Sequence, residues 1–379
     1  MMRRILAILF VCIVALFATA CIGQMDDTSS PVSQVDDDFT AGKAALEAGN
    51  YAEAYARLSA STAEEAATLL EKLVYVPTKR AQDNEIYTVY QYDKNGNLVF
   101  MESDYGDYGA TTNYTYNEKG QLIYIESVNA EKVKTTTAYT YDEAGNRVTQ
   151  EWNCDGETTK YELTYDSQHR CLTKKQINAN GDTFLTTYRY DVDGNKTYER
   201  IDYPDDTWYE QNFLYITKDK PLREWGSDSN GGNYESTYVY DEAGLLQKYT
   251  VAGEEHTYAY DEKGQLIQEN NPDGTVITYT YDEAGNRVTE KHAVADGNEY
   301  ITTHTYDESG RLLSAENNHG GWRKFTYDEN GNKRTEAVGG DTEKDYSWEY
   351  EWELHYYPDG VPEEVEEIRT SNVNPQSVM

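Results

Sequence analysis

Three kinds of side chain recur in this sequence at spacings that could support chemistry: acids in an Asp-x-x-Gly pattern, tyrosines two residues apart, and tryptophans outside any pattern. The acids are candidates for Ca²⁺, a cation that takes about six to eight oxygens converging on one point. One Asp per turn does not supply them, and no segment matches the loop D-x-[DN]-x-[DN]-G followed by its distal Glu. We therefore predict a structural role for these acids and no metal site.

Catalytic arrangements are not evident in the sequence. The six His are scattered without metal-ligand spacing, and no Ser-His-Asp, Cys-His or phosphate-loop pattern occurs. We predict that the protein is not an enzyme and has no cofactor.

Aromatic side chains are the stronger candidates for binding. The chain has 36 Tyr against 7 Phe, and Tyr and Trp offer a flat apolar face with a polar rim on which sugars stack. The strict recurrence of the tyrosines favours internal packing. Tryptophans that break the repeat consensus are therefore the candidate ligand-binding residues: Trp152, Trp208, Trp225 and Trp322.

One repeated pattern, Y-x-Y-D-x-x-G-x-[LV], must position these side chains. It reads YQYDKNGNL from Tyr90, YTYNEKGQL from Tyr114, YAYDEKGQL from Tyr258, and YTYDEAGNRV from both Tyr139 and Tyr279. Two aromatics that lie two residues apart share one face of a strand. Asp-x-x-Gly suits a type I turn whose Gly takes a left-handed conformation and forms a bulge. Each unit is therefore predicted to be a β-hairpin.

Twelve such units follow one another over residues 85–360, and each carries a Tyr before its turn. We predict a mainly β fold in which tandem antiparallel β-hairpins form a long twisted or curled sheet, with its aromatic face turned inward. The twelve tyrosines are Tyr92, Tyr116, Tyr141, Tyr165, Tyr190, Tyr215, Tyr240, Tyr260, Tyr281, Tyr306, Tyr327 and Tyr356.

These units resemble the YD repeats of the Rhs family. In long members of that family the hairpins build a spiral sheet that encloses a shell around a C-terminal toxin. In this chain only an acidic tail, residues 361–379, follows the last turn. The resemblance therefore implies the scaffold, whereas toxin delivery becomes an alternative in which the chain is an accessory or remnant of such a system.

The N-terminus resembles a bacterial lipoprotein signal. Arg3 and Arg4 precede an apolar run, and Ala18-Thr19-Ala20 leads to Cys21. Residues 1–20 are the expected signal, Cys21 the lipidated residue that anchors the chain to a membrane outside the cytoplasm, and residues 21–38 an acidic tether. An uncleaved anchor or an ordinary signal with an incidental cysteine remains the alternative.

Residues 39–77 have helical periodicity, so we predict a small N-terminal α-helical segment. The string AALEAGNYAEAYARL resembles the middle of a tetratricopeptide unit. Ser61 with Glu64 reads as a capping box, and Pro77 should end the last helix. The segment holds too few units for a free-standing array, so we expect it to cap the repeats.

The C-terminal strand and the cysteines complete the expectations. Residues 348–356 alternate aromatic and charged side chains, which predicts a terminal strand whose charges discourage edge pairing.

Cys154 and Cys171 fall at opposite ends of their hairpins, roughly 25 Å apart at ~3.3 Å per residue. We therefore predict two free thiols rather than a disulfide.

Charge narrows the functional classes. The net charge is −35, and such a field repels phosphate backbones, so nucleic acid is not an expected partner. The favoured hypothesis is a surface-exposed, lipid-anchored repeat protein that presents a scaffold for binding carbohydrate or another protein. A structural spacer without a specific ligand is the alternative from a different class.

Overall fold

The computed structural model describes residues 36–82, 85–104, 109–340 and 345–373. The signal, Cys21 and most of the tether lie outside these residues. The helices are α2 (Asp37–Glu47), α3 (Tyr51–Ala60), α4 (Glu64–Leu70) and α5 (Glu363–Val373). None of these described helices has the length and apolar character needed to cross a membrane.

The remaining elements are strands, as the hairpin repeats predict. In chain order they are β1 (Leu73–Gln82), β2 (Glu85–Tyr92), β3 (Leu98–Ser103), β4 (Ala110–Tyr116), β5 (Leu122–Asn129), β6 (Lys134–Tyr141), β7 (Arg147–Cys154), β8 (Glu157–Tyr165), β9 (Cys171–Ile177), β10 (Thr183–Tyr190), β11 (Lys196–Asp202), β12 (Trp208–Thr217), β13 (Lys220–Asp228), β14 (Asn233–Tyr240), β15 (Leu246–Val251), β16 (Glu254–Tyr260), β17 (Leu266–Asn270), β18 (Val276–Tyr281), β19 (Arg287–Ala293), β20 (Glu299–Tyr306), β21 (Leu312–Asn317), β22 (Trp322–Tyr327), β23 (Lys333–Gly339) and β24 (Tyr346–Tyr356).

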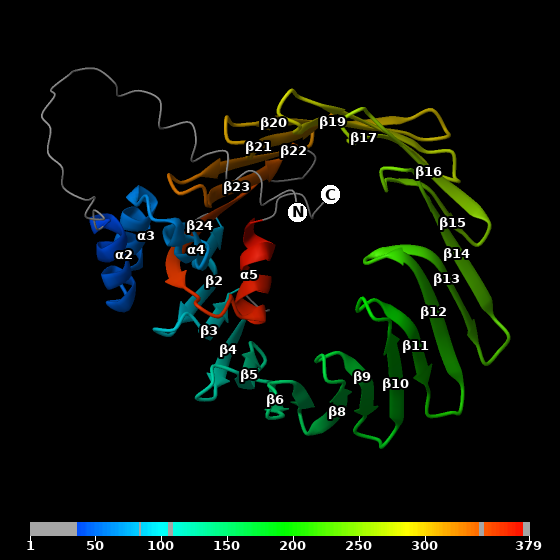
Figure 1. Cartoon of the computed structure of the whole chain (residues 1–379), viewed down its shortest axis with the longest axis horizontal. Coiled ribbons are helices and arrows are strands. Elements are labelled where there is room, and N and C mark those ends of the chain that lie inside the picture. Colours follow the sequence, from blue (N-terminus) through cyan, green and yellow to red (C-terminus); the bar gives the residue numbers. More distant parts are fainter. Residues whose placement is uncertain (1–35, 83–84, 105–108, 341–344, 374–379) are drawn as a thin grey trace, which may run out of the picture.

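All these strands form one sheet, and the sheet closes on itself. Each strand pairs antiparallel with the next, and β24 pairs with β1, so that a barrel of 24 strands results (Figure 1). The sequence predicted a long twisted or curled sheet without deciding between an open and a closed one. The structure shows that the sheet is closed, so that no described strand has a free edge. Closure removes the unpaired backbone groups that an edge would expose, and β24 is an interior partner rather than a terminal cap.

The strand that closes the barrel comes from the segment predicted to be helical. Helix α4 ends at Leu70, and Leu73 begins β1, which pairs from Leu73↔Tyr356 to Gln82↔Trp348. Pro77 therefore lies inside a strand instead of ending a helix. The pairing register shifts between Pro77 and Lys79, and a bulge is one of the places where a strand tolerates a residue that lacks an N–H.

The repeat turns have the predicted geometry. In the unit at Asp142, the Gly145 N–H donates to the Asp142 carbonyl at 3.2 Å, and Gly145 has a φ of 92°. The Asn146 N–H donates to Asp142 Oδ1 at 2.8 Å, and Asn146 Nδ2 donates to Oδ2 at 2.7 Å. The ladder register shifts just before the turn, between Thr140 and Tyr141. The type I turn with its bulge is confirmed.

Two hydrophobic clusters flank the closing strands. Leu73 and Leu354 pack against the helices α2–α4, with Leu58 at the centre of that cluster. Val76, on the opposite face of β1, packs with Val365 of α5. Figure 1 shows α5 within the ring and α2–α4 outside it. The N-terminal helices therefore cover the outer face beside the closure, and α5 covers the inner face.

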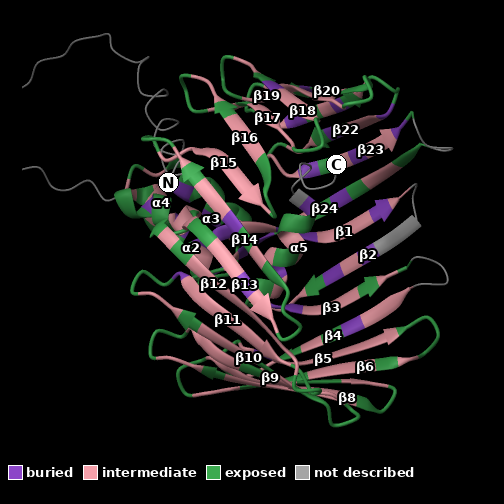
Figure 2. Ribbon diagram, turned by 90° about the vertical axis from the view of Figure 1, so that its right-hand side faces the viewer, coloured by how far each residue is buried: buried purple, intermediate pink, exposed green. Residues whose placement is uncertain are grey.

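Burial is concentrated in this part of the barrel. Many of the fully buried side chains lie on β1–β3, β21–β24 and the helices, whereas most strands elsewhere are half-buried on both faces (Figure 2). A barrel of about 16 strands already leaves an aqueous interior, because side chains no longer meet across it. With 24 strands, an inward aromatic face is expected to stay partly exposed.

Two predicted boundaries differ from the structure. The acidic tether does not extend to residue 38, because Asp36 caps α2 and accepts a hydrogen bond from the Phe39 N–H at 2.8 Å. The acidic C-terminal tail is helical over Glu363–Val373, and its first-turn glutamates suit the positive end of the helix dipole. Composition predicted a solvated tether for the first segment, but Asp36 is the N-cap of α2; in the second segment, Glu363, Glu364 and Glu366 form the first turn of α5.

Candidate functional site: the inner face of the barrel

Nine of the twelve tyrosines that stand before a turn donate a hydrogen bond to the preceding repeat. Tyr116 Oη donates to the Leu98 carbonyl at 2.9 Å, and Tyr141 Oη donates to the Leu122 carbonyl at 2.6 Å. The same bond recurs at these further residues: Tyr92, Tyr165, Tyr190, Tyr260, Tyr281, Tyr306 and Tyr327. The tyrosine ladder is therefore a structural device that fixes one hairpin to the next.

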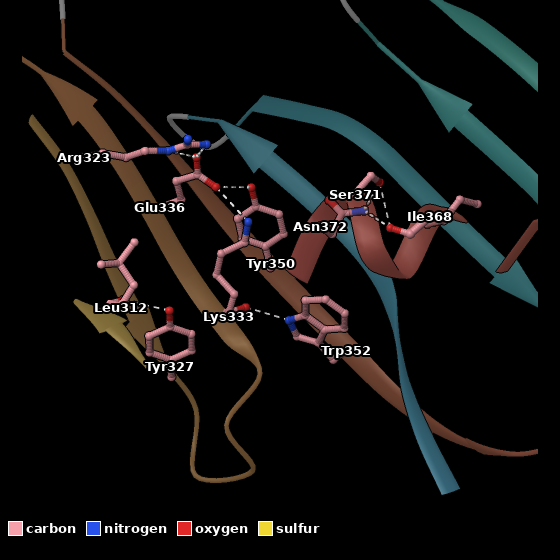
Figure 3. A network of polar contacts seen from close by, with 10 residues as sticks. All are labelled: Leu312, Arg323, Tyr327, Lys333, Glu336, Tyr350, Trp352, Ile368, Ser371 and Asn372. Carbon is pink, nitrogen blue, oxygen red and sulfur yellow. Dashed lines mark hydrogen bonds and ion pairs between the residues drawn. The ribbon is translucent and has the colours of Figure 1, made fainter. Parts of the chain in front are cut away.

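The last unit departs from the predicted assignment. Trp352 Nε1 donates to the Lys333 carbonyl at 2.6 Å (Figure 3), so Trp352 occupies the ladder position that the sequence pattern gave to Tyr356. Tyr356 instead packs against the N-terminal helices. In place of a twelfth hairpin, β24 pairs with β1 from the other end of the chain, and Tyr92 Oη donates to the Pro77 carbonyl, which continues the ladder across this closure.

Burial raises the pKa of two ladder phenols, Tyr327 and Tyr116. Desolvation raises the pKa of Tyr327 to about 12, and it raises the pKa of Tyr116 further, with help from the Glu364 carboxylate of α5. Tyr116 Oη also donates to Glu364 Oε1 at 2.8 Å. This contact confirms that the aromatic face turns inward, because α5 lies inside the ring.

The carboxylates of the turn acids accept hydrogen bonds within their own turns, as Asp142 shows. Both oxygens of Asp142 accept hydrogen bonds within its own turn, and the bond from Asn146 is the main reason that the pKa of Asp142 is lowered. No group of three or more His, Cys, Asp or Glu in the described part of the chain is placed to hold a metal ion. The turn geometry supports the structural role predicted for these acids.

The four candidate tryptophans are not brought together. Strand alternation puts Trp152 on the same face as Gln150, which borders a hollow together with Glu363 of α5, so Trp152 faces inward. The other three lie on the outer face, each beneath a cation: Arg200 is 4.7 Å from the ring of Trp208, Arg223 is 4.7 Å from that of Trp225, and Lys324 is 4.9 Å from that of Trp322.

An inner aromatic row, made of Phe184, Tyr203, Tyr209 and Tyr234, crosses β10 to β14 near the ends opposite the Asp turns. The Phe184 and Tyr203 rings meet edge to face with centroids 6.0 Å apart, and Tyr209 stacks on Tyr234 at 6.1 Å. Gly226 lies beneath this stack, since a Cβ there would come within 2.2 Å of the Tyr234 ring. The row thus depends on one glycine to let two rings meet.

A cavity of about 480 Å³ lies on the inner face where β20–β24, β1 and α5 meet. Its polar centre is Glu336, a buried carboxylate. Lys333 Nζ donates to Glu336 Oε2 at 2.8 Å, Tyr350 Oη donates to the same oxygen at 3.0 Å, and Arg323 Nε donates to Oε1 at 2.8 Å (Figure 3). Trp322, the first residue of β22, contributes to the edge of this cavity although strand alternation puts its ring on the outer face beside Lys324; the other three candidate tryptophans do not border the cavity.

The pKa values of Glu336 and Lys333 are set by their burial and by the charges beside them. Burial alone would raise the pKa of Glu336, but the hydrogen bonds and charges of Lys333 and Arg323 outweigh it and leave that pKa below its ordinary value. For Lys333, burial lowers the pKa, Glu336 opposes this, and the neighbouring Arg323 and Arg80 lower it further. The two groups form a buried ion pair with two additional cations beside it.

Sequence analysis missed this cavity and the inner aromatic row. One signal was present: Lys333 stands directly after a repeat turn, where Leu98, Leu122, Leu266 and Leu312 stand in other units. Arg147, Lys196 and Arg287 occupy the same position in other units and do not line this cavity, so the charge of Lys333 alone could not have located it. Cys154 and Cys171 are free thiols, as predicted.

Comparisons with known proteins agree with the repeat pattern. Residues 141–183 and 260–299 match the family model described as RHS Repeat, and among curated proteins no sequence matches the chain. The crystal structure of TcdB2-TccC3 aligns with a TM-score of 0.42 and 16% identity, over 69% of this chain and 17% of that chain.

Two further solved structures show weaker alignments. A Tc holotoxin pore from Photorhabdus luminescens gives a TM-score of 0.35 and 16% identity, over 69% of this chain and 16% of that chain. A porin-like protein from Bacteroides uniformis gives a TM-score of 0.21 and 12% identity, over 64% of this chain and 95% of that chain. The chain therefore spans about a sixth of the length of the Tc chains that it matches.

Proposed function

We propose that this chain, which carries RHS repeats in a closed barrel of strands, is a non-catalytic scaffold that binds an extended carbohydrate or a protein segment along its inner face. The observation that carries the proposal is the inner aromatic row, whose rings come from neighbouring strands and remain partly exposed: 37% of the Tyr203 surface is accessible. Aligned aromatic faces with polar rims are suited to sugar rings and to extended peptides.

The outer tryptophans are less suited to this role. A cation already lies over Trp208, Trp225 and Trp322, so a sugar that stacked on that side would have to displace it. Trp152 is 37% exposed on the inner face, and no cation of the described residues lies over its ring. The favoured site thus includes Trp152 and the inner aromatic row.

Binding is tested by screening the chain from Gln24 onward on arrays of glycans and cell-wall polysaccharides. Capture that falls at least tenfold in Trp152→Ala and Tyr203→Ala, but not in the outer-face control Trp225→Ala, would support the inner site. Capture that only Trp225→Ala abolishes would place the ligand outside the barrel. A blank array from folded protein would leave a structural spacer as the better reading.

Membrane attachment is a separate part of the proposal. The order of charged, apolar and small residues before Cys21 supports a lipid anchor on that cysteine. Mass spectrometry of the mature N-terminus should find a lipidated Cys21, and Cys21→Ala should move the protein from the membrane to the soluble fraction. An unmodified Cys21 in a membrane-bound chain would contradict this anchor.

A further inference from the structure

The cavity beside α5 carries a charge opposite to that of the whole chain. The charged residues that line it are Arg80, Arg323, Lys333 and Glu336, which gives three positive charges and one negative, a net of +2. The chain as a whole has a net charge of −35. Charged residues on a protein surface usually serve solubility, but three cations inside one cavity of an acidic protein suggest a specific role for the positive charge.

Glu336 has no capacity left to neutralise the third cation. Its Oε1 accepts from Arg323 Nε, and its Oε2 accepts from Lys333 Nζ and Tyr350 Oη (Figure 3). Arg80 lies directly opposite Tyr350 in the β1–β24 ladder, yet its Nε atom is buried and has no hydrogen-bond partner among the described residues. A buried donor on a charged group is costly when it is left unpaired.

The walls of the cavity define the shape and polarity of an occupant. The Arg80 guanidinium is 5.4 Å from the ring of Trp348, and Lys333 Nζ is 4.3 Å from the ring of Tyr350. Thr302 and Asn317 add polar side chains, and Ser371 of α5 borders the opening. A guanidinium beside flat aromatic faces is suited to a planar carboxylate attached to a ring that carries hydroxyl groups.

We propose that this cavity is a binding site for a small sugar acid, whose carboxylate pairs with Arg80 and Lys333 and whose ring lies against the aromatic walls. The volume, about 480 Å³, is in the range of small-molecule sites. The site goes beyond the scaffold role, because it is separate from the inner aromatic row and takes a ligand of defined charge.

The test compares galacturonate with galactose, which differ only in the carboxylate, by calorimetric titration of the full chain in detergent. Galacturonate should bind, and galactose should bind at least tenfold more weakly. Arg80→Met should weaken galacturonate binding at least tenfold with little change in the melting temperature, because the Arg80 Nε has no hydrogen-bond partner among the described residues and only the contact of the guanidinium with the Trp348 ring is lost. Arg223→Met, which changes an outer-face arginine, is the matched control and should leave the affinity unchanged.

Three outcomes would overturn the proposal. Equal binding of galactose, or galacturonate binding that Arg80→Met does not alter, would exclude a carboxylate site at Arg80. Inorganic phosphate that competes as well as galacturonate would show a general anion site instead of one for sugar acids. Absence of galacturonate binding while the glycan array still captures ligand would remove this site and leave the scaffold proposal standing.

Discussion

Tyr92 Oη donates a hydrogen bond of 2.8 Å to the carbonyl of Pro77. Tyr92 ends the first strand of the repeats, whereas Pro77 belongs to the strand that arrives from the N-terminal helices. In the next unit, Tyr116 makes the equivalent bond to the carbonyl of Leu98, the residue that follows a repeat turn. Pro77 therefore takes the place that Leu98 has in a repeat. The N-terminal strand thus completes the last repeat, and the ladder is continuous across the two ends of the barrel.

Loss of this bond should have a measurable cost. In Tyr92→Phe the buried Pro77 carbonyl loses its phenol donor, and we expect the free energy of unfolding to fall by about 1 kcal/mol. Tyr300→Phe is the control, since Tyr300 is about half exposed and its ring lies at a tilted angle to that of His319, with centroids 5.0 Å apart. Urea denaturation followed by circular dichroism measures both. Equal stability of Tyr92→Phe and the unchanged protein would mean that water replaces the phenol.

Closure itself can be tested by removing β1. A chain that begins at Glu85 exposes β2 and β24 as two new edges, and we expect it to self-associate. A chain that begins at Lys72 lacks only α2–α4 and keeps β1, so it should remain closed. Size-exclusion chromatography with light scattering distinguishes them. A monomeric chain from Glu85 that melts at the same temperature would contradict the role of β1 in closing the barrel.

The buried carboxylate in the cavity should matter for folding. Glu336→Gln leaves Lys333 and Arg323 without their anion, and removal of one partner from a buried pair costs about 3 kcal/mol. Glu316→Gln breaks the exposed pair with Lys324 and should cost less than about 1 kcal/mol. The comparison is made by urea denaturation at neutral pH, and similar losses in both variants would argue against a buried network.

Local features of this fold could be predicted from sequence because their causes are local. The turn at Asp142 needs only an acid, a glycine and the intervening residues, and two aromatics such as Tyr139 and Tyr141 share a face in any strand. Antiparallel hairpins, the inward aromatic face and the free thiols follow from these facts.

Features that depend on distant partners could not be predicted. The spacing of Leu69, Leu70, Leu73 and Val74 fits a helix. The segment that begins at Leu73 forms a strand because it pairs with β24, near the other end of the chain, starting at Leu73↔Tyr356. The cavity has the same origin: Arg80 and Glu336 come from opposite ends of the repeat region, so they meet only after closure. Sequence patterns within one repeat hold no information about such contacts.

Acid should weaken the attachment of the first helix. The Asp36 carboxylate accepts hydrogen bonds from the Phe39 N–H, which contributes most to lowering its pKa, and from Ser61 and Thr62, so that this pKa falls to about 2. It also accepts a hydrogen bond from the Ala63 N–H. Asp36 thereby links the starts of α2 and α4, and Ala63, not Ser61, is the N-cap of α4. The Ser61–Glu64 capping box is therefore absent.

The sign of the pH effect follows from this lowered pKa. A carboxylate whose pKa is lower in the folded state stabilises it above the ordinary value near 3.8 and loses this effect as pH falls toward about 2. Asp36→Asn should lower the melting temperature at pH 7, and the difference from the unchanged protein should shrink between these two values. Thermal melts across that range would contradict the linkage if the difference stayed constant.

The docking of α5 inside the ring should stabilise the closure. Val365 is 0% exposed and packs with Val76, Leu98 and Tyr357 from the closing strands and the last turn. Val365→Ala removes two buried carbon atoms and leaves a small cavity, so we expect a loss of about 2 kcal/mol in the free energy of unfolding. Val192→Ala makes the same chemical change at a turn residue that is 95% exposed, and it should have almost no effect. Equal urea midpoints for the two variants would show that α5 contributes nothing to the stability of the barrel, whereas a selective loss at Val365 would make the helix part of the same cooperative unit.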